Sequence, residues 1–320
     1  MIIVTGGLGF IGSNIIARLN DLGVDDILVV DDFTEGERIK NVRNLNFKDY
    51  IDKFDFLELL EKDRELGRVS QVFHQGACSA TTEWDGKYLM KNNFEYSKLL
   101  YHWCVNRKVP FIYASSASVY GLGLNGFKEE RTCEMPINMY AFSKFQFDQY
   151  VRQTHHNHSQ SQVVGLRYFN VYGPRENFKG NMSSTIFHFN NQAKQQNVCK
   201  LFKGTDGILN GEQQRDFIHV DDCVSVNLWF LENNISGIFN VGTGVPRTFN
   251  DVAKCIKNWY AEYEDTEISI KYIEFPRHLI GSYQNFTQAD LVNLRSVGYD
   301  HNFLSLEEGI RDYVSFQNEN

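Results

Sequence analysis

The sequence predicts an α/β fold in which helices cover both faces of a doubly wound parallel sheet. One observation is the start of the chain, where the β-branched run Ile2-Ile3-Val4 leads into a glycine-rich turn and then into apolar residues at helical spacing, residues 14–20. The other is that buried strands and amphipathic helices continue to alternate through the first half of the chain. Unbroken apolar runs are typical of strands that are covered on both faces.

Three glycines follow the first predicted strand at intervals of three residues. In a strand–turn–helix unit, Gly6 allows the tight turn, Gly9 lets the backbone approach a pyrophosphate, and Gly12 lets the helix pack close to the strand. We therefore expect a Rossmann-type dinucleotide-binding site. The G-x-x-G-x-x-G spacing resembles that of short-chain dehydrogenase/reductase proteins. For this motif alone, a glycine turn that serves only structure is the alternative.

A second buried strand, residues 27–30, ends in two carboxylates, Asp31 and Asp32. Asp31 lies 19 residues after Gly12, where an acid that binds the adenosine ribose is expected. The polar loop beyond contains Arg38, which could hold a 2′-phosphate, whereas the two carboxylates favour a free 2′-hydroxyl. NADP and NAD therefore both stay open, and Arg38 could also be a merely solvated side chain.

Strand and helix patterns continue to alternate up to residue 169. Further strands are expected at 72–74, 111–116 and 163–169, and helices over 88–107 and from 139 onward. We assign 1–169 to a Rossmann domain to which 216–241 returns, with 216–222 looking like a strand of the main sheet. We assign 170–215 and 242–320 mainly to a smaller α/β substrate-binding lobe.

Composition argues against several classes of protein. The formal net charge of −8 and a pI near 5.6 disfavour a nucleic-acid surface. No apolar run of about 18 residues is present, and a strand beginning at Ile2 leaves no room for a signal peptide, so we expect no membrane span and a cytoplasmic protein. The six cysteines form no C-x-x-C pair, which suits a reducing compartment. His155-His-Asn-His158 has no evident partner ligands, and no metal site is expected.

Ser116, Tyr140 and Lys144 form the most specific chemical pattern. Tyr140 and Lys144 are four residues apart and share one face of the predicted helix. An ammonium about 4–5 Å from a phenol, at an effective dielectric near 20, stabilises the phenolate by roughly 3–4 kcal/mol and so lowers its pKa. Such a tyrosine can take a proton from an alcohol while a hydride leaves for a nicotinamide, with Ser116 bonded to the same oxygen. Tyr-x-x-x-Lys by itself is common by chance, so the argument depends on the glycine fingerprint upstream.

At these residues a family resemblance becomes plain. The motifs at 6–12, 115–121, 140–144 and 167–175 resemble the extended short-chain dehydrogenases that act on nucleotide sugars. The blocks at 74–79 and 81–88, with Lys179-Gly180, 214–217 and 286–290, resemble the ADP-L-glycero-D-manno-heptose 6-epimerase family more narrowly. The resemblance implies tightly bound NADP, an ADP-heptose substrate that is a precursor of lipopolysaccharide core, and a homo-oligomer, specifically a homopentamer.

The implied reaction interconverts ADP-D-glycero- and ADP-L-glycero-β-D-manno-heptose at C6. That carbon is a secondary alcohol with no adjacent carbonyl, so direct proton abstraction is prohibitively hard. Transient oxidation to a ketone, with hydride return to the opposite face, inverts the centre without net redox change. Two acid/base groups are then needed, and the resemblance assigns them to Tyr140 and Lys179. Without the resemblance, Lys179 is only a solvated loop lysine.

The same residue-by-residue matching implies two sets of binding residues. The cofactor set is Gly6, Gly9, Phe10, Ile11, Gly12, Asp31, Asp32, Arg38, Lys53, Gln75, Gly76, Ala77, Cys78, Ser79, Asn92, Lys144, Val171 and Lys179. The substrate set is Ser116, Asn170, Asn181, His188, Phe202, Lys203, Gly204, Thr205, Arg215 and Tyr283. Arg215 is the expected diphosphate partner because its guanidinium is a planar fork of donors.

Three departures from the family pattern stand out. Asp32 replaces a more usual asparagine and would repel a 2′-phosphate. Asn181 replaces serine, and the loop at 207–214 is longer than the pattern, so the matching of Arg215 rests on Arg-Asp-Phe.

Other functions remain alternatives at this stage. A nucleotide-sugar dehydratase is disfavoured, because Ser116 is followed by Ala117-Ser118 rather than by an Asp-Glu pair. A UDP-hexose 4-epimerase shares Ser, Tyr and Lys, and only the block around Trp84 and Lys179 favours the heptose enzyme. A catalytically silent dinucleotide-sensing scaffold would generally lack the Tyr-Lys pair.

Overall fold

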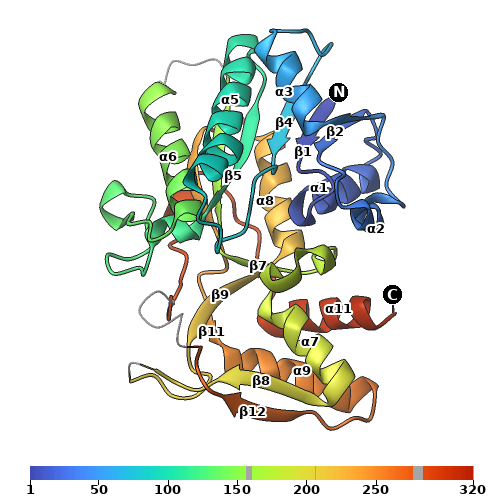
Figure 1. Ribbon diagram of the computed structural model, residues 1–320, viewed down its shortest axis with the longest axis vertical. Coiled ribbons are helices and arrows are strands. Elements are labelled where there is room, and N and C mark those ends of the chain that lie inside the picture. The colour runs from blue at the N-terminus through green and yellow to red at the C-terminus, as the bar shows by residue number, and fades with distance from the viewer. Residues whose placement is uncertain (156–160, 206, 277–283, 320) are drawn as a thin grey trace.

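A seven-stranded, entirely parallel sheet forms the larger part of the molecule (Figure 1). The computed structural model describes residues 1–155, 161–205, 207–276 and 284–319. The sheet order is β10-β6-β5-β4-β1-β2-β3. The strands are β1 (Ile2–Thr5), β2 (Ile27–Asp31), β3 (Asp49–Asp52), β4 (Gln71–His74), β5 (Phe111–Ser116), β6 (Val163–Tyr168) and β10 (Gly237–Val241). The order reverses between β1 and β4, which confirms the predicted doubly wound sheet.

Helices cover both faces of this sheet, as Figure 1 shows. The helices of this part are α1 (Phe10–Asp21), α2 (Ile39–Val42), α3 (Lys53–Glu61), α4 (Gly86–Leu89), α5 (Tyr96–Arg107), α6 (Met139–Thr154), α8 (Val220–Glu232) and α10 (Val292–Ser296), of which α4 packs on α6 rather than on the sheet. Alternate side chains of a strand enter different cores. Val4 belongs to the core that includes residues of α1 and α8, whereas its neighbour Ile3 belongs to the core that includes residues of α3, α5 and α6.

A smaller lobe has its own core, drawn from α7, α9, α11 and the strands beside them. Its helices are α7 (Thr185–Gln196), α9 (Phe249–Tyr263) and α11 (Leu306–Glu319). A three-stranded sheet in the order β11-β9-β7 comprises β7 (Asn170–Tyr172), β9 (Gln214–His219) and β11 (Pro246–Thr248), and a two-stranded sheet pairs β8 (Val198–Phe202) with β12 (Ser269–Ile273). The chain therefore leaves the seven-stranded sheet directly after β6.

The strand predicted to return at residue 216 joins a different sheet from the one expected. β9 pairs with β7 and β11, and the chain re-enters the main sheet through α8 and β10. The expectation for residues 216–222 was wrong because an apolar run shows only that a strand is buried. Phe217 enters the core of the smaller lobe and Ile218 that of the sheet domain, so β9 serves both.

The helix predicted over 88–107 contains a segment that its sequence pattern did not indicate. α4 and α5 are joined by a π-helical segment, η2 (Met90–Glu95). Within it, the Asn93 amide accepts from Cys78 N at 2.8 Å and donates to Cys78 O at 3.0 Å. The wider helical turn thus directs a side chain toward the chain that leaves β4, which is a common use of π segments near functional sites.

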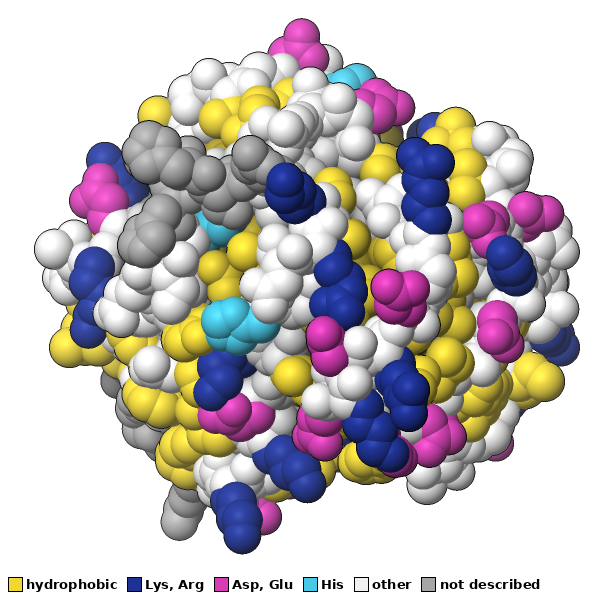
Figure 2. All heavy atoms as spheres, turned by 90° about the horizontal axis from the view of Figure 1, so that it is seen from above, with side chains coloured by type: hydrophobic (Ala, Val, Ile, Leu, Met, Phe, Trp, Pro, Cys, Tyr) yellow, Lys and Arg dark blue, Asp and Glu magenta, His cyan; other side chains and the backbone are white. Residues whose placement is uncertain are grey.

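The surface shown in Figure 2 carries acidic and basic side chains interspersed, rather than gathered by sign. Among the described residues, no helix is long and apolar enough to cross a membrane.

Candidate active site

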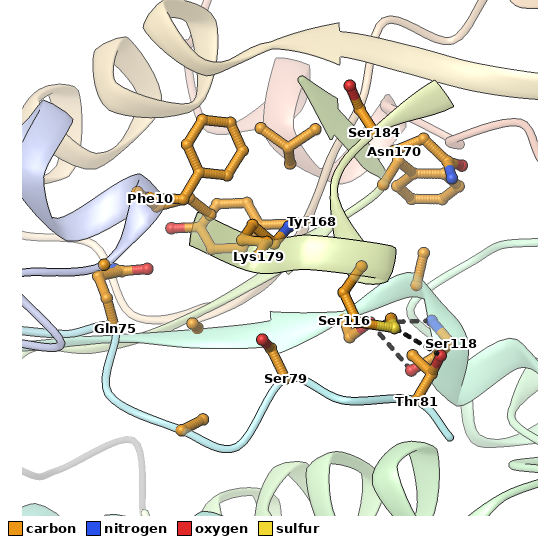
Figure 3. Close-up of a pocket in the computed structure, with 18 of the residues that line it drawn as sticks. Phe10, Gln75, Ser79, Thr81, Ser116, Ser118, Tyr168, Asn170, Lys179 and Ser184 are labelled. Carbon is orange, nitrogen blue, oxygen red and sulfur yellow. Dashed lines mark hydrogen bonds between the residues drawn. The ribbon is translucent and has the colours of Figure 1, made fainter. Parts of the chain in front are cut away.

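A cavity of about 490 Å³ lies at the carboxyl ends of β1, β2, β4 and β5 and is also lined by residues of the smaller lobe (Figure 3). Its volume is that of a small-molecule site. The predicted residues that line it are Gly6, Gly9, Phe10, Ile11, Gly12, Asp31, Arg38, Gln75, Gly76, Ala77, Ser79, Ser116, Tyr140, Lys144, Asn170, Val171, Lys179 and Arg215. The glycine motif, the Tyr-Lys pair and Lys179 therefore meet in one space.

The glycine turn forms a cradle that larger residues would fill. Gly6 has a φ of +67°, and a Cβ there would lie 2.6 Å from Gly76 N. A Cβ on Gly12 would lie 2.1 Å from the carbonyl oxygen of Gly6. Gly9 is the N-cap of α1 and provides no side-chain cap, and residues 9–12 line the cavity, so the first turn of this helix borders the cavity without a capping oxygen. Such a helix start suits a phosphate, which is the fit that a dinucleotide requires.

Asp31 lies at the end of β2 and is nearly buried. Its carboxylate accepts from Leu8 N and Asp32 N, both at 2.8 Å, and lies 3.4 Å from Arg38 Nη1. Burial raises the pKa of Asp31, and these hydrogen bonds and Arg38 oppose that rise. Arg38 also lies over the Phe178 ring, 5.3 Å from its centroid. The acid and the arginine are thus paired with each other at the end of the cavity that adjoins β2.

The Tyr-Lys pair extends from the first turns of α6 toward the end of β5. Asn138 caps this helix by accepting from Ala141 N, which fixes where Tyr140 projects. The Lys144 ammonium donates to the carbonyl oxygen of Ala114 at 2.8 Å. Ser116 Oγ accepts from Ser118 N at 3.2 Å and from Ser118 Oγ at 2.9 Å, as Figure 3 shows.

The pKa values of Tyr140 and Lys144 are shifted mainly by burial rather than by their pairing. Burial raises the pKa of Tyr140, and its interaction with Ser116 offsets only part of that rise. Burial also lowers the pKa of Lys144 to about 8, against the opposing effect of Asp148. The expectation weighed the charges of Lys144 and a nicotinamide without the desolvation of the two side chains, which raises the pKa of Tyr140 and lowers that of Lys144.

A buried ionic network holds the Tyr140 side of the cavity. Asp148, one turn beyond Lys144 on α6, accepts from Ser115 Oγ at 2.9 Å, from Tyr113 OH at 3.0 Å and from Arg167 Nε at 2.9 Å. Arg167 also forms an ion pair with Glu134. Burial alone would raise the pKa of Glu134, but Arg152 and Arg167 outweigh it and hold that pKa below its usual value.

Lys179 reaches the cavity from a short helical turn, η5 (Asn177–Met182), rather than from a regular helix. It is half-buried, and its Nζ lies 5.1 Å from the centroid of the Phe10 ring. Figure 3 shows the two side chains beside each other. Burial lowers the pKa of Lys179, while nearby Glu176 raises it.

Several predicted residues do not line the cavity. The cofactor candidates of this kind are Asp32, Lys53, Cys78 and Asn92, and the substrate candidates are Asn181, His188, Phe202, Lys203, Gly204 and Thr205. Lys53 Nζ donates to Asn92 Oδ1 at 2.9 Å, and Asp32 accepts from Thr34 N at 2.8 Å. Tyr283 and the histidine run beyond His155 lie outside the described residues.

Other residues that line the cavity were not predicted from the sequence. They include Thr81, Ser118, Phe178, Met182, Ser183, Ser184, Thr185, Phe217, Phe249, Gln284 and Thr287. A signal was available for the hydroxyl run at 183–185, since Ser184 caps α7 by accepting from Phe187 N. Thr287 donates to Asn170 Oδ1 at 3.3 Å. No sequence pattern could indicate this contact, because 117 residues separate the two.

Within the described residues, no group of three or more His, Cys, Asp or Glu side chains is placed to hold a metal ion.

The fold and this cavity define a dinucleotide-binding α/β protein of the short-chain dehydrogenase type. The model of the NAD dependent epimerase/dehydratase family matches residues 2–242, and the chain belongs to that family.

Two relatives of known activity narrow the similarity. The chain is 53% identical over 315 residues to an ADP-L-glycero-D-manno-heptose-6-epimerase from Alkalilimnicola ehrlichii, covering 98% of this chain and 96% of the relative. The crystal structure of the Helicobacter pylori ADP-L-glycero-D-manno-heptose-6-epimerase superposes with a TM-score of 0.83 at 30% identity, covering 100% of this chain and 96% of that one. The resemblance predicted from the motifs is thereby confirmed.

A UDP-N-acetylglucosamine 4-epimerase from Methanobrevibacter ruminantium has the same TM-score, 0.83, at 27% identity, and covers 100% of this chain and 98% of its own. The fold alone therefore does not distinguish a heptose epimerase from a UDP-sugar epimerase. The sequence does favour one of them, since the identity is 53% to the Alkalilimnicola ehrlichii enzyme and 27% to the Methanobrevibacter ruminantium enzyme.

Proposed function

We propose that the protein is an ADP-glyceromanno-heptose 6-epimerase that supplies a precursor of lipopolysaccharide core. It interconverts ADP-D-glycero-β-D-manno-heptose and ADP-L-glycero-β-D-manno-heptose. The observation that carries the proposal is that Tyr140 and Lys179, from two separate elements, line one cavity together with the glycine cradle. The high identity to the Alkalilimnicola ehrlichii epimerase supports the substrate assignment.

Inversion at C6 needs a proton-transfer group for each face of the sugar carbon. A bound nicotinamide dinucleotide would accept the hydride from C6 and return it to the opposite face. Tyr140 takes the hydroxyl proton on one face, and Ser116 holds the same oxygen. Lys179 transfers the proton for the other face. Lys144, protonated at neutral pH by its pKa of about 8, favours the phenolate of Tyr140.

The nucleotide end of the cavity suits NADP as the cofactor of this proposal. Arg38 is half-exposed beside Asp31 and over Phe178, so its guanidinium can turn toward a 2′-phosphate. NAD is the alternative because Asp31 and Asp32 both carry negative charge. Denaturing the purified protein and separating the released dinucleotide by chromatography decides between them, and Arg38→Gln should weaken retention of NADP but not of NAD.

Arg215 and Asn170 are the proposed substrate contacts that line the cavity from the side of the smaller lobe. The Arg215 guanidinium lies near the Phe249 ring, 5.8 Å from its centroid, and is nearly buried. A buried guanidinium fork suits a diphosphate. We further propose a cytoplasmic homo-oligomer, specifically a homopentamer, which light scattering of the purified protein would test.

The test of the function is incubation of ADP-D-glycero-β-D-manno-heptose with the purified protein and no added cofactor. Resolution of the C6 epimers by NMR should show approach to a mixture, with no net change in nicotinamide absorbance at 340 nm. Turnover of a UDP-hexose without turnover of the heptose would contradict the proposed substrate and would indicate a UDP-hexose 4-epimerase that uses the same chemistry. Failure of both substrates would favour the silent scaffold.

A further inference from the structure

The segment that carries Lys179 is fixed at its base by a fully buried carboxyl group. Glu176 precedes η5 and has no exposed surface. It accepts from Gly173 N at 3.3 Å, from Ser184 N at 2.5 Å and from Ser184 Oγ at 2.7 Å. One side chain therefore ties together the two ends of the loop in which Lys179 lies.

The backbone of Glu176 adds two further bonds to the same loop. Its carbonyl oxygen accepts from Lys179 N at 3.0 Å and from Ser183 Oγ at 3.1 Å. Side chain and backbone of Glu176 together thus bind both ends of this loop and the backbone of Lys179 itself. Burying a carboxyl group is costly unless such donors satisfy it, so the site is built for a charged or strongly accepting side chain.

The turn before Glu176 is anchored to the nucleotide-binding half of the molecule. Arg175 has a φ of +73°, which is uncommon for a residue with a Cβ. Its Nη1 donates to Asn14 Oδ1 at 2.8 Å, and its carbonyl oxygen accepts from Asn41 Nδ2 at 3.1 Å. Asn14 also donates to the carbonyl oxygen of Pro174 at 2.9 Å. The position of the loop is therefore set from α1 and α2, beside the glycine turn.

We propose that Glu176 is a positioning residue that holds the Lys179 loop, and with it the Lys179 side chain, against the cavity. The inference rests on the role of Lys179 in the proposed function. Glu176 does not line the cavity, so it acts through Lys179 and not on the substrate.

The electrostatic surroundings of Lys179 agree with that role. The charged or titratable groups around the loop include Arg175 and Glu176 on the loop, His219 and Asp221 beside Gly173 and Arg175, and Tyr313 from α11. Those along the cavity include Asp31, Arg38, Tyr140, Lys144 and Arg215. Burial lowers the pKa of Lys179, and Glu176 is the group whose charge raises it. Loss of that charge should therefore lower the lysine pKa further.

The experiment uses the full-length holoprotein with Glu176→Gln, Glu176→Asp and Ser184→Ala. Lysines labelled with ¹³C at Cε are titrated by NMR, and the Lys179 signal is assigned by its absence in Lys179→Met. Glu176→Gln should lower the Lys179 pKa, whereas Ser184→Ala, which removes one hydrogen bond and no charge, should leave it unchanged. Cleavage after Lys179 by a lysine-specific endoprotease should become faster in Glu176→Gln because the loop ends are released.

Turnover gives a third measurement. Glu176→Gln should reduce kcat about 10- to 100-fold with little change in KM, and the pH limb that belongs to Lys179 should move to lower pH. A purely structural role would lower activity without moving that limb. An unchanged Lys179 pKa together with unchanged cleavage in folded Glu176→Gln would overturn the proposal.

Glu176→Asp keeps the test decisive if Glu176→Gln does not fold. It retains the charge but withdraws the carboxylate by one methylene group. The Lys179 pKa should therefore stay close to its wild-type value, whereas cleavage after Lys179 should become faster. Cleavage at the wild-type rate would overturn the positioning role. Neither NMR nor proteolysis depends on turnover. Both therefore test the positioning role of Glu176 even if Lys179→Met keeps full epimerase activity, which would contradict the proposed function.

Discussion

The two proposed acid/base groups are held in different ways. Tyr140 extends from a regular helix that a buried ionic network fastens to the central sheet. Arg167 and Asp148, both without exposed side-chain surface, are the centre of that network. Lys179 lies on a short turn whose neighbour Gly180 has non-helical angles, φ 54° and ψ −126°, and which depends on Glu176.

The difference shows two solutions to one problem. The helix and strand on the Tyr140 side leave little freedom, which suits the group that must stay aligned with Ser116 and a nicotinamide. The loop on the Lys179 side has no α-helix or strand around the lysine, only a short helical turn, which suits a group that must admit a bulky nucleotide sugar. Disruption on the Tyr140 side should therefore cost stability, whereas disruption on the Lys179 side should mainly cost turnover.

Removing either acid/base group should give the largest effect. We expect Tyr140→Phe and Lys179→Met each to lower kcat by about 10²- to 10⁴-fold, because each removes one proton-transfer step. Tyr263→Phe on α9, where the ring is 53% exposed, and Lys194→Met on the exposed side of α7 are the matched controls and should keep full activity. Epimer ratios followed by NMR measure the rates. Near-normal turnover by Lys179→Met would show that Lys179 is not an acid/base group of the reaction, and the two sides of the cavity would then not share that role.

Arg167→Met tests the network on the Tyr140 side. It leaves Asp148 and Glu134 buried without their guanidinium, and we expect a loss of about 3–5 kcal/mol in the free energy of unfolding. Arg311→Met removes an exposed ion pair to Asp312, 3.5 Å long, and should change stability by less than about 1 kcal/mol. Urea denaturation monitored by circular dichroism compares them. Equal midpoints for the two variants would show that the network is not what holds α6.

These two sides of the cavity also differ in how far the sequence predicted them. Tyr140, Lys144 and Ser116 follow from local rules, namely helical spacing and a hydroxyl at a strand end, and the structure brings them together. Lys179 lies on no periodic element, so spacing could not place it and only the family resemblance did. The sheet that β9 joins was misjudged for a similar reason, since burial of a strand does not reveal its partner.

Electrostatics were the least predictable part of the site. The charge of Lys144 near Tyr140 could be inferred from four-residue spacing, but the desolvation of both groups depends on tertiary packing around α6. The carboxyl group of Glu176 was also invisible as a buried residue, because Pro-Arg-Glu-Asn looks like an exposed turn. Its donors, Gly173 N and Ser184 N, come together only when the loop folds.

The pH dependence should show the contribution of Lys144. Its pKa is lowered from the usual value to about 8, so the ammonium loses its proton as the pH rises through 8. Epimerase activity that depends on this charge should decline above about pH 8, and the cofactor's positive charge can only move that limb lower. Lys144→Arg should be slower but should lack this limb, because a guanidinium keeps its charge. Rate–pH profiles check this, and an identical limb in Lys144→Arg would assign it to another group.

The smallest expected effect is at Gly180, next to Lys179. A Cβ there would meet nothing within 4 Å, so Gly180→Ala should cost only backbone strain, about 1–2 kcal/mol, or a few degrees in Tm. Gly67→Ala is the matched control, because Gly67 also has a positive φ, +74°, and open space but does not line the cavity. Both variants should lose similar stability in thermal unfolding, yet only Gly180→Ala should lower kcat, since strain there is relieved by shifting Lys179. Equal kcat values for the two variants would mean that the loop tolerates a shifted backbone, and that Glu176 rather than the turn geometry alone sets the position of the ammonium.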